Sequence, residues 1–137
     1  MTLTMPTPDP EVLARRDDIV AALRAIVPGE GVIDHPDGLR PYESDGLTAY
    51  QQPPMVVVLP ETTSQVAAVI RWCNENNVRI VPRGAGTSLS GGALPLEDGV
   101  LLGMSRFNRI LDIDYIDRVV VAQPGVTNLA VTEAVES

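Results

Sequence analysis

The chain has 137 residues, enough for one domain, and 45% of them are hydrophobic, enough for a buried core. Its 10 basic residues, all arginine, face 18 acidic ones, and the resulting net charge of -8 disfavours binding to nucleic acid. The lack of lysine excludes a Walker A phosphate loop, and one cysteine with one histidine excludes a disulfide framework and the usual zinc-ligand spacings.

The first predicted element is a helix that begins at Pro10 and ends before Pro28. Asp9 can cap its N-terminus, and proline suits the first helical position. One apolar stripe runs along the helix at helical spacing and consists of Val12, Ile19, Val20, Leu23, Ile26 and Val27. The following segment, residues 30–54, is rich in turn residues and has no sustained period, so it predicts an irregular connection.

From residue 55 onward the pattern changes to short strands and helices. The apolar run 55–59 predicts a strand covered on both faces. Thr62 with Gln65 forms a capping box that opens a helix, and a second strand is predicted at 78–82. A strand–helix–strand unit of this length has parallel strands. The remaining predicted elements are strands at 100–104, 110–113 and 119–122 and a last helix that Thr127 can cap.

These elements predict an α/β (α+β) fold, with an N-terminal helix followed by a small parallel βαβ sheet. We expect two parts: the N-terminal helix with its irregular extension at residues 1–50, and a ligand-binding part at residues 51–137. The last predicted helix has no stop signal before the chain ends, so the architecture is expected to be truncated. An unfinished sheet exposes an edge and apolar surface, which predicts self-association.

A glycine-rich stretch, residues 83–95 (RGAGTSLSGGALP), follows the second predicted strand. It therefore lies at the carboxyl edge of the sheet, where open α/β sheets bind ligands. Its glycines allow close approach, its successive N–H groups suit phosphate oxygens, and Arg83 adds positive charge. The composition fits a diphosphate cradle; the alternative is a surface loop whose glycines only form turns. Leu89 replaces the third glycine of the Rossmann fingerprint, so NAD on a Rossmann helix is not expected.

The run 81–95 resembles the pyrophosphate loop of FAD-linked oxidases that share the vanillyl-alcohol-oxidase/p-cresol-methylhydroxylase (PCMH) type of flavin domain. From about Arg40 onward, the segments YESDGLTAY, VVVLPET and QPGVTNLA resemble, in the same order, the FAD-binding subunits of glycolate oxidases. The resemblance implies that residues 51–137 are the first part of a PCMH-type FAD-binding domain. It also implies the cofactor-binding residues Pro82, Arg83, Gly84, Ala85, Gly86, Thr87, Ser88, Ser90, Gly91, Pro124, Gly125 and Val126.

For the whole protein, the resemblance implies an FAD-dependent oxidase or dehydrogenase of a small 2-hydroxy acid such as glycolate. Hydride would pass from the α-carbon to flavin N5, and electrons would continue to partner subunits that include an iron–sulfur protein. FAD-linked D-lactate and D-2-hydroxyglutarate dehydrogenases share the loop and stay open as alternatives, as does a non-catalytic nucleotide-binding or assembly module. Family members run to several hundred residues, so this chain resembles an amino-terminal fragment that is inactive alone, with no catalytic residue or metal site assigned.

The resemblance also bears on how FAD is attached. Some family members link FAD covalently through a histidine in the loop. Thr87 occupies that position here, which implies noncovalent FAD. Tyr42 and Asp45 lie in a segment shared with the family, and we expect that segment to anchor the N-terminal part against the flavin domain.

Other candidate residues favour structural roles. His35 stands in a turn-rich segment without an evident partner, and Cys73 falls on an apolar helical stripe, which favours packing over redox chemistry. Asp112, Asp114 and Asp117 lack the glycine and closing glutamate of a calcium loop, so they indicate a hairpin turn. No apolar run is long enough to cross a membrane, and the N-terminus lacks leader features. We expect a cytoplasmic protein, or one peripheral at the inner face of the membrane through its partners.

Overall fold

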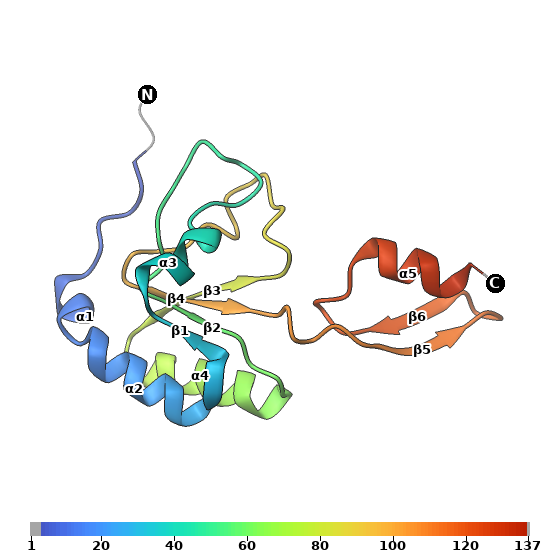
Figure 1. The fold of residues 1–137 in the computed structure, drawn as a ribbon, viewed down its shortest axis with the longest axis horizontal. Helices are drawn as coiled ribbons and strands as arrows, with labels where there is room; N and C mark the ends of the chain where they lie inside the picture. Colours follow the sequence, from blue (N-terminus) through green and yellow to red (C-terminus); the bar gives the residue numbers. More distant parts are fainter. Residues whose placement is uncertain (1–3, 137) are drawn as a thin grey trace.

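The structure is a computed structural model, and it describes residues 4–136 of the chain. Its elements are α1 (Pro10–Ala14), α2 (Arg16–Ile26), η1 (Gly29–Gly31), β1 (Val32–Ile33), α3 (Pro36–Leu39), η2 (Arg40–Tyr42), β2 (Val56–Val58), α4 (Thr63–Glu75), β3 (Arg79–Arg83), β4 (Gly99–Gly103), β5 (Ile110–Asp114), β6 (Val119–Ala122) and α5 (Asn128–Val135) (Figure 1). The mixed α/β class predicted from the sequence is confirmed.

The main sheet has four strands in the order β1-β2-β4-β3. β2 and β3 run parallel to β4, as the strand–helix–strand pattern predicted, and β4 lies between them. All five residues of β4 are buried, so this strand forms the centre of the fold. The carboxyl ends of β2, β3 and β4 consequently meet at one edge of the sheet.

The connection at 30–54 is not wholly irregular, and that prediction is wrong for its first part. Val32 and Ile33 form β1, which pairs antiparallel with β2 through Val58 and Val57. His35 caps the short helix α3, since its Nδ1 accepts a hydrogen bond from the Gly38 N–H at 3.0 Å. A strand of two residues is too short to show a period of two, which is why the pattern did not reveal it.

The N-terminal helix predicted as one element consists of two pieces. Arg15 separates them with φ -95° and ψ 11°, although no glycine or proline marks the break. The start of α1 is held where the Asp9 N–H donates to Asp98 at 2.8 Å, whereas Ile19 and Leu23 of α2 are buried in the core. We attribute the break to these two attachments, which fix the directions of α1 and α2 separately.

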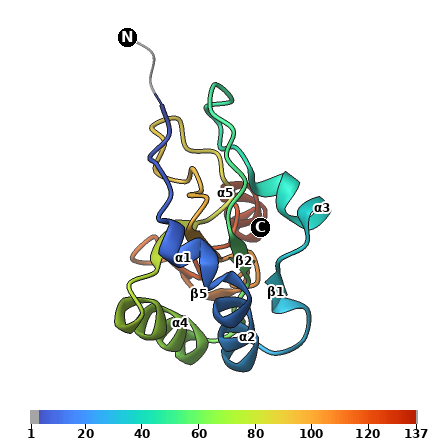
Figure 2. The same ribbon diagram turned by 90° about the vertical axis from the view of Figure 1, so that its left-hand side faces the viewer.

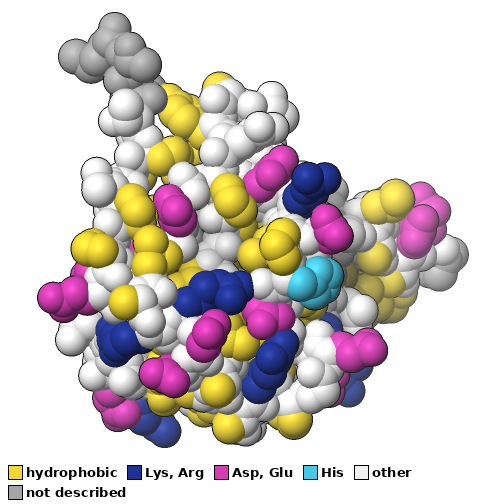
Figure 3. Space-filling model, turned by 60° about the vertical axis from the view of Figure 1, so that its left-hand side comes forward, with side chains coloured by type: hydrophobic (Ala, Val, Ile, Leu, Met, Phe, Trp, Pro, Cys, Tyr) yellow, Lys and Arg dark blue, Asp and Glu magenta, His cyan; other side chains and the backbone are white. Residues whose placement is uncertain are grey.

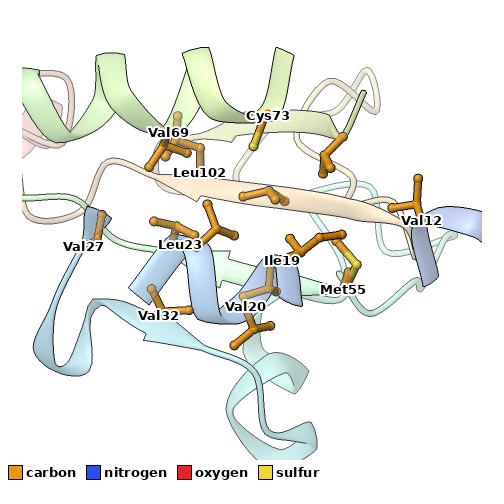
Figure 4. Close-up of a cluster of buried hydrophobic side chains, with 14 residues drawn as sticks. Val12, Ile19, Val20, Leu23, Val27, Val32, Met55, Val69, Cys73 and Leu102 are labelled. Carbon is orange, nitrogen blue, oxygen red and sulfur yellow. The ribbon is translucent and has the colours of Figure 1, made fainter. Parts of the chain in front are cut away.

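The sheet is covered on both faces, as the apolar run of β2 predicted. On one face α1, α2 and α4 pack over the sheet and share one buried cluster with it (Figures 2 and 4). On the other face, Leu39 of α3 packs in a second buried cluster with the strand residues Val57, Val81 and Leu101. Residues from both sides of position 50 therefore contribute to the first cluster, in which Leu23 and Val69 are fully buried.

Helix α4 begins and packs as its sequence predicted. Thr62 Oγ1 accepts a hydrogen bond from the Gln65 N–H at 3.2 Å, and Gln65 Oε1 accepts one from the Glu61 N–H at 2.8 Å. Cys73 on its apolar stripe is fully buried, and desolvation raises the pKa of the thiol to about 11. The thiol is therefore protonated at neutral pH, which agrees with a packing role.

The last three elements form a separate unit that projects from the main sheet (Figure 1). β5 and β6 pair antiparallel, and Asp114 Oδ1 accepts hydrogen bonds at 2.9 Å from the N–H groups of Ile116 and Asp117. These acidic residues therefore form the predicted hairpin turn. Thr127 Oγ1 caps α5 by accepting from the Ala130 N–H at 3.2 Å. In the described part of the chain, no helix is long and apolar enough to cross a membrane.

Asp98 joins the start of α1 to the edge strand β3. The residue is 2% exposed, and its Oδ2 accepts hydrogen bonds from the Asp9 N–H and from the Arg79 guanidinium. Burial alone would raise the pKa of this carboxyl, but the hydrogen bonds from Arg79 and Asp9 and the charge of Arg79 lower it below its ordinary value. The charged form of Asp98 consequently stabilises the folded state.

We predict that Asp98→Ala lowers the free energy of unfolding by about 2 kcal/mol at neutral pH, because it removes a buried charged acceptor. Since the folded pKa lies below the unfolded one, this contribution is complete above the ordinary pKa of about 4 and disappears as the pH falls through the folded value. Urea unfolding of both proteins between pH 7 and pH 2.5 measures the difference. Glu61→Gln is the control, because Glu61 pairs with Arg106 at 2.6 Å but is 64% exposed, and a cost below about 1 kcal/mol is expected. A difference that stays constant over this pH range would contradict the prediction.

Candidate functional site

The glycine-rich loop, residues 83–95, begins at Arg83, the last residue of β3, and leads to β4. It therefore lies at the carboxyl edge of the sheet, as predicted, beside the segment that leads from η2 to β2 (Figures 1 and 2). Gly86 and Gly91 have φ of 72° and 78°, a region that favours glycine. These two positions turn the chain so that the loop curves.

The loop presents a row of unpaired backbone donors. Within the described residues, the N–H groups from Gly84 through Leu89 donate to no protein acceptor. Further along, the Ser90 N–H donates to Ser88 Oγ at 3.3 Å and the Leu94 N–H to the Gly91 carbonyl at 3.2 Å. Unpaired N–H groups in a curved glycine-rich loop form a concave site that suits phosphate oxygens.

Arg83 supplies the positive charge at the base of the loop. Its Nη1 donates to the Tyr42 carbonyl at 3.1 Å, and its guanidinium carbon lies 5.8 Å from the centre of the Tyr42 ring. The guanidinium also packs on Gly86, where a Cβ would overlap it. Within residues 4–136, no carboxylate oxygen lies within 4.0 Å of this group, so its charge is not neutralised by an ion pair.

The second predicted segment, residues 124–126, lies next to the first. A Cβ on Gly84 would be 4.0 Å from the Pro124 carbonyl oxygen. The Gly125 N–H donates to the Phe107 carbonyl at 2.7 Å, which fixes the turn just beyond the end of β4. The structure thus brings the loop and the turn together at one edge, although about 40 residues separate them.

Residues 42–46 form a third segment at the site, and the sequence predicted only an anchoring role for them. Gly46 lies against the loop so closely that a Cβ would be 2.7 Å from the Thr87 carbonyl oxygen and 2.9 Å from that of Ser88. Asp45 beside it is 5% exposed, and its Oδ2 is buried without a hydrogen-bond partner among the described residues. The motif YESDG was the only sequence signal for this contact.

An apolar cavity lies beside the turn at residues 124–126. A cavity of about 550 Å³ borders Pro124 and is lined largely by apolar side chains, among them Val66, Met104 and Phe107. On the face in Figure 3, arginines and acidic side chains alternate, so no patch of one sign forms there. Among the described residues, no group of three or more His, Cys, Asp or Glu side chains is arranged to hold a metal ion.

A glycine loop with free N–H groups at the carboxyl edge of parallel strands is typical of nucleotide-binding α/β proteins. The chain belongs to the FAD binding domain family, whose profile matches residues 54–137. Over 120 residues it is 51% identical to the glycolate oxidase subunit GlcD of Escherichia coli (strain K12) and 34% identical to the mitochondrial D-2-hydroxyglutarate dehydrogenase of Bos taurus. Each alignment covers 88% of this chain, and the chain spans 24% and 22% of the two relatives.

Solved structures agree with this assignment. The chain superposes on p-cresol methylhydroxylase with substrate bound at a TM-score of 0.79 and 24% identity, covering 98% of this chain and 26% of that one. The 4-ethylphenol oxidase of Gulosibacter chungangensis gives the same TM-score at 25% identity, covering 96% and 26%. The fold is therefore that of part of a PCMH-type flavin domain, as the glycine loop and its flanking motifs indicated.

Proposed function

We propose that the chain is the FAD-binding portion of a flavin-dependent 2-hydroxy-acid oxidoreductase and that the FAD pyrophosphate lies on residues 82–92. The row of free N–H groups from Gly84 through Leu89 supports this proposal most directly. It offers hydrogen-bond donors at the carboxyl edge of the sheet, next to Arg83, which has no ion-pair partner among the described residues. A diphosphate needs both features, because it is a dense anion without hydrogen-bond donors of its own.

The roles of individual residues follow from their positions. The loop residues form the cradle: Gly84, Ala85, Gly86, Thr87, Ser88, Ser90 and Gly91. Pro82 and Arg83 shape the start of the loop, since Arg83 joins it to Tyr42. The turn of Pro124, Gly125 and Val126 lies beside Gly84 and the apolar cavity, a position suited to the flavin.

We propose that FAD binds noncovalently. Thr87 in the loop has no ring nitrogen that could form a histidyl link. The chain contains one histidine, and His35 caps α3 through its Nδ1. Cys73 is fully buried and protonated, so it is not available as a thiolate.

For the whole protein, we propose that glycolate is the substrate, with other 2-hydroxy acids as close alternatives. The 51% identity to a glycolate oxidase subunit supports glycolate, and the 34% identity to a D-2-hydroxyglutarate dehydrogenase supports the wider class. When bound, FAD supplies the hydride acceptor for this chemistry. The first relative is a subunit of its enzyme, which supports assembly of the whole protein with further chains. We propose that these chains include an iron–sulfur subunit. We also propose that the complex is cytoplasmic or peripheral to the membrane.

The experiment that tests the proposal is a titration of the purified chain with FAD, followed by flavin fluorescence. We predict saturable binding that Gly86→Val weakens about tenfold or more, because a β-branched residue at φ 72° distorts the loop. The matched control is Gly29→Val. Gly29 has φ 76° with nothing within 4 Å of a Cβ, so it carries the same backbone strain away from the loop.

Three outcomes would contradict parts of the proposal. Equal FAD affinities of the wild-type chain and Gly86→Val would mean that the pyrophosphate does not lie on this loop. Absence of FAD binding to a chain shown to be folded by its circular dichroism would contradict the proposal that this portion binds the cofactor. Dialysis of the FAD-saturated chain in denaturant tests the noncovalent attachment, since flavin retained by the unfolded chain would overturn it.

A further inference from the structure

Backbone hydrogen bonds do not fix the curve of the glycine-rich loop. Among the described residues, the N–H and carbonyl groups from Gly84 through Leu89 form no hydrogen bond with the protein. The start of the loop is held, since the Met104 N–H donates to the Arg83 carbonyl at 2.9 Å. The shape of the stretch that follows therefore depends on packing.

The side chain of Arg83 packs against this stretch at Gly86. A Cβ on Gly86 would lie 2.5 Å from both the Cζ and the Nε of Arg83, and it would also overlap Nη2. The guanidinium therefore occupies the space into which a side chain at position 86 would project. The chain leaves the sheet at Arg83 and turns back, at a φ of 72°, onto the side chain of that same residue.

Tyr42 holds the guanidinium from outside the loop. Arg83 Nη1 donates to the Tyr42 carbonyl at 3.1 Å, and Cζ lies 5.8 Å from the centre of the ring. Tyr42 is the last residue of η2, where carbonyl groups lack helical donors, so an arginine is a suitable partner there. Tyr42 also packs on the buried cluster that contains Leu39 and Leu101. The guanidinium thus joins the loop to a part of the fold that the core holds in place.

We propose that Arg83 is a positioning residue of the diphosphate site and that its planar guanidinium, rather than its charge alone, keeps residues 84–89 curved. A loop that is already ordered loses less conformational entropy when the anion binds, so its affinity is higher. Lysine carries the same charge on a compact ammonium group, which cannot both donate to Tyr42 and pack flat on Gly86. The inference rests on the proposed function and assigns Arg83 a role within that site.

The first test measures loop order in the ¹⁵N-labelled chain without ligand. In Arg83→Lys, the amides of residues 84–89 are expected to become mobile, with order parameters below about 0.6. The amide of Leu101 in β4 should keep its wild-type value, which shows that the chain is folded. Arg71→Lys is the control, because Arg71 is an exposed arginine on α4. Equal order of the loop in Arg83→Lys and the wild-type chain overturns the proposal.

The second test measures the affinity for inorganic pyrophosphate and for FAD. Arg83→Lys and Arg83→Ala are both expected to weaken each ligand about tenfold, because both variants lose the planar group. Arg71→Lys should change neither affinity. Wild-type affinity in Arg83→Lys means that a positive charge suffices, and this result overturns the proposal.

The third test asks whether Arg83 and Gly86 act as a pair. Gly86→Ala should weaken pyrophosphate about tenfold in the wild-type chain, because the methyl group displaces the guanidinium. In Arg83→Ala the same substitution meets no guanidinium, and the further loss should be less than about threefold. The strain of an alanine at φ 72° is common to both backgrounds, so the difference isolates the overlap. Losses that multiply to about a hundredfold overturn the pairing.

The outcomes separate this inference from the proposed function. If the wild-type chain binds both ligands and Arg83→Lys binds them equally well, the role of Arg83 fails while the loop remains the site. If the loop becomes mobile in Arg83→Lys without a loss of affinity, the positioning role fails in the same way. If the wild-type chain binds neither FAD nor pyrophosphate, the proposed function fails, and the role of Arg83 fails with it.

Discussion

Leu101→Ala is expected to lower the free energy of unfolding by about 3 kcal/mol, within the range of 2 to 5 that buried leucines show. Leu101 is fully buried in the central strand β4, between Val57 of β2 and Val81 of β3. Leu39 covers the same cluster from α3, so neighbouring strands and the helix restrict how far the cavity can close. A domain of this size has about 5 to 15 kcal/mol in total, which makes the loss severe.

Urea unfolding followed by circular dichroism measures this effect. The matched control is Leu111→Ala in β5, whose side chain is 58% exposed, and a change within about 0.5 kcal/mol is expected there. The slope of the unfolding transition should be unchanged in both variants if only stability differs. Equal losses in the two variants would mean that β4 is not the centre of the core.

Gly125→Ala is expected to damage both the fold and the cofactor site. A Cβ on Gly125 would overlap the Met104 carbonyl oxygen and lie 2.7 Å from that of Phe107. Both atoms belong to the backbone, so they cannot rotate away as a flexible side chain can. The turn must shift and lose its hydrogen bond to Phe107, which we expect to cost about 2 kcal/mol.

Because the turn lies beside Gly84, the same displacement should weaken FAD binding at least tenfold. Thermal unfolding and the FAD titration together measure the two effects. Gly92→Ala is the control for stability, since its Cβ would meet nothing closer than Ser88 Oγ at 4.0 Å. It should be neutral or slightly stabilising, because alanine restricts the unfolded chain. Unchanged stability in Gly125→Ala would contradict the close packing of this turn.

The elements that the sequence predicted well are those with local signals. Asp9, Thr62 and Thr127 each cap the helix that follows them, and the corresponding hydrogen bonds are present. The strand β2 was recognisable because a short continuous apolar run is what burial on both faces requires. The glycine loop was recognisable because its glycines are close together in the sequence and directly follow a predicted strand.

The features that sequence reasoning missed depend on contacts between distant residues. β4 lies between β2 and β3 because it pairs with both of them, and no local sequence pattern in these strands indicates that order. The break at Arg15 depends on Asp98, which lies far along the chain. The contact of Arg83 with Tyr42 joins residues 41 positions apart, so no local pattern could reveal that this segment packs beside the loop.

The buried thiol of Cys73 makes the chain a reporter of its own opening. The side chain is fully buried on α4, and its pKa of about 11 leaves almost no thiolate in the folded state. An alkylating reagent can therefore modify it only when α4 leaves the sheet and exposes the sulfur. Because the chain has no second cysteine, the rate of modification reports the opening free energy at that one helix under native conditions.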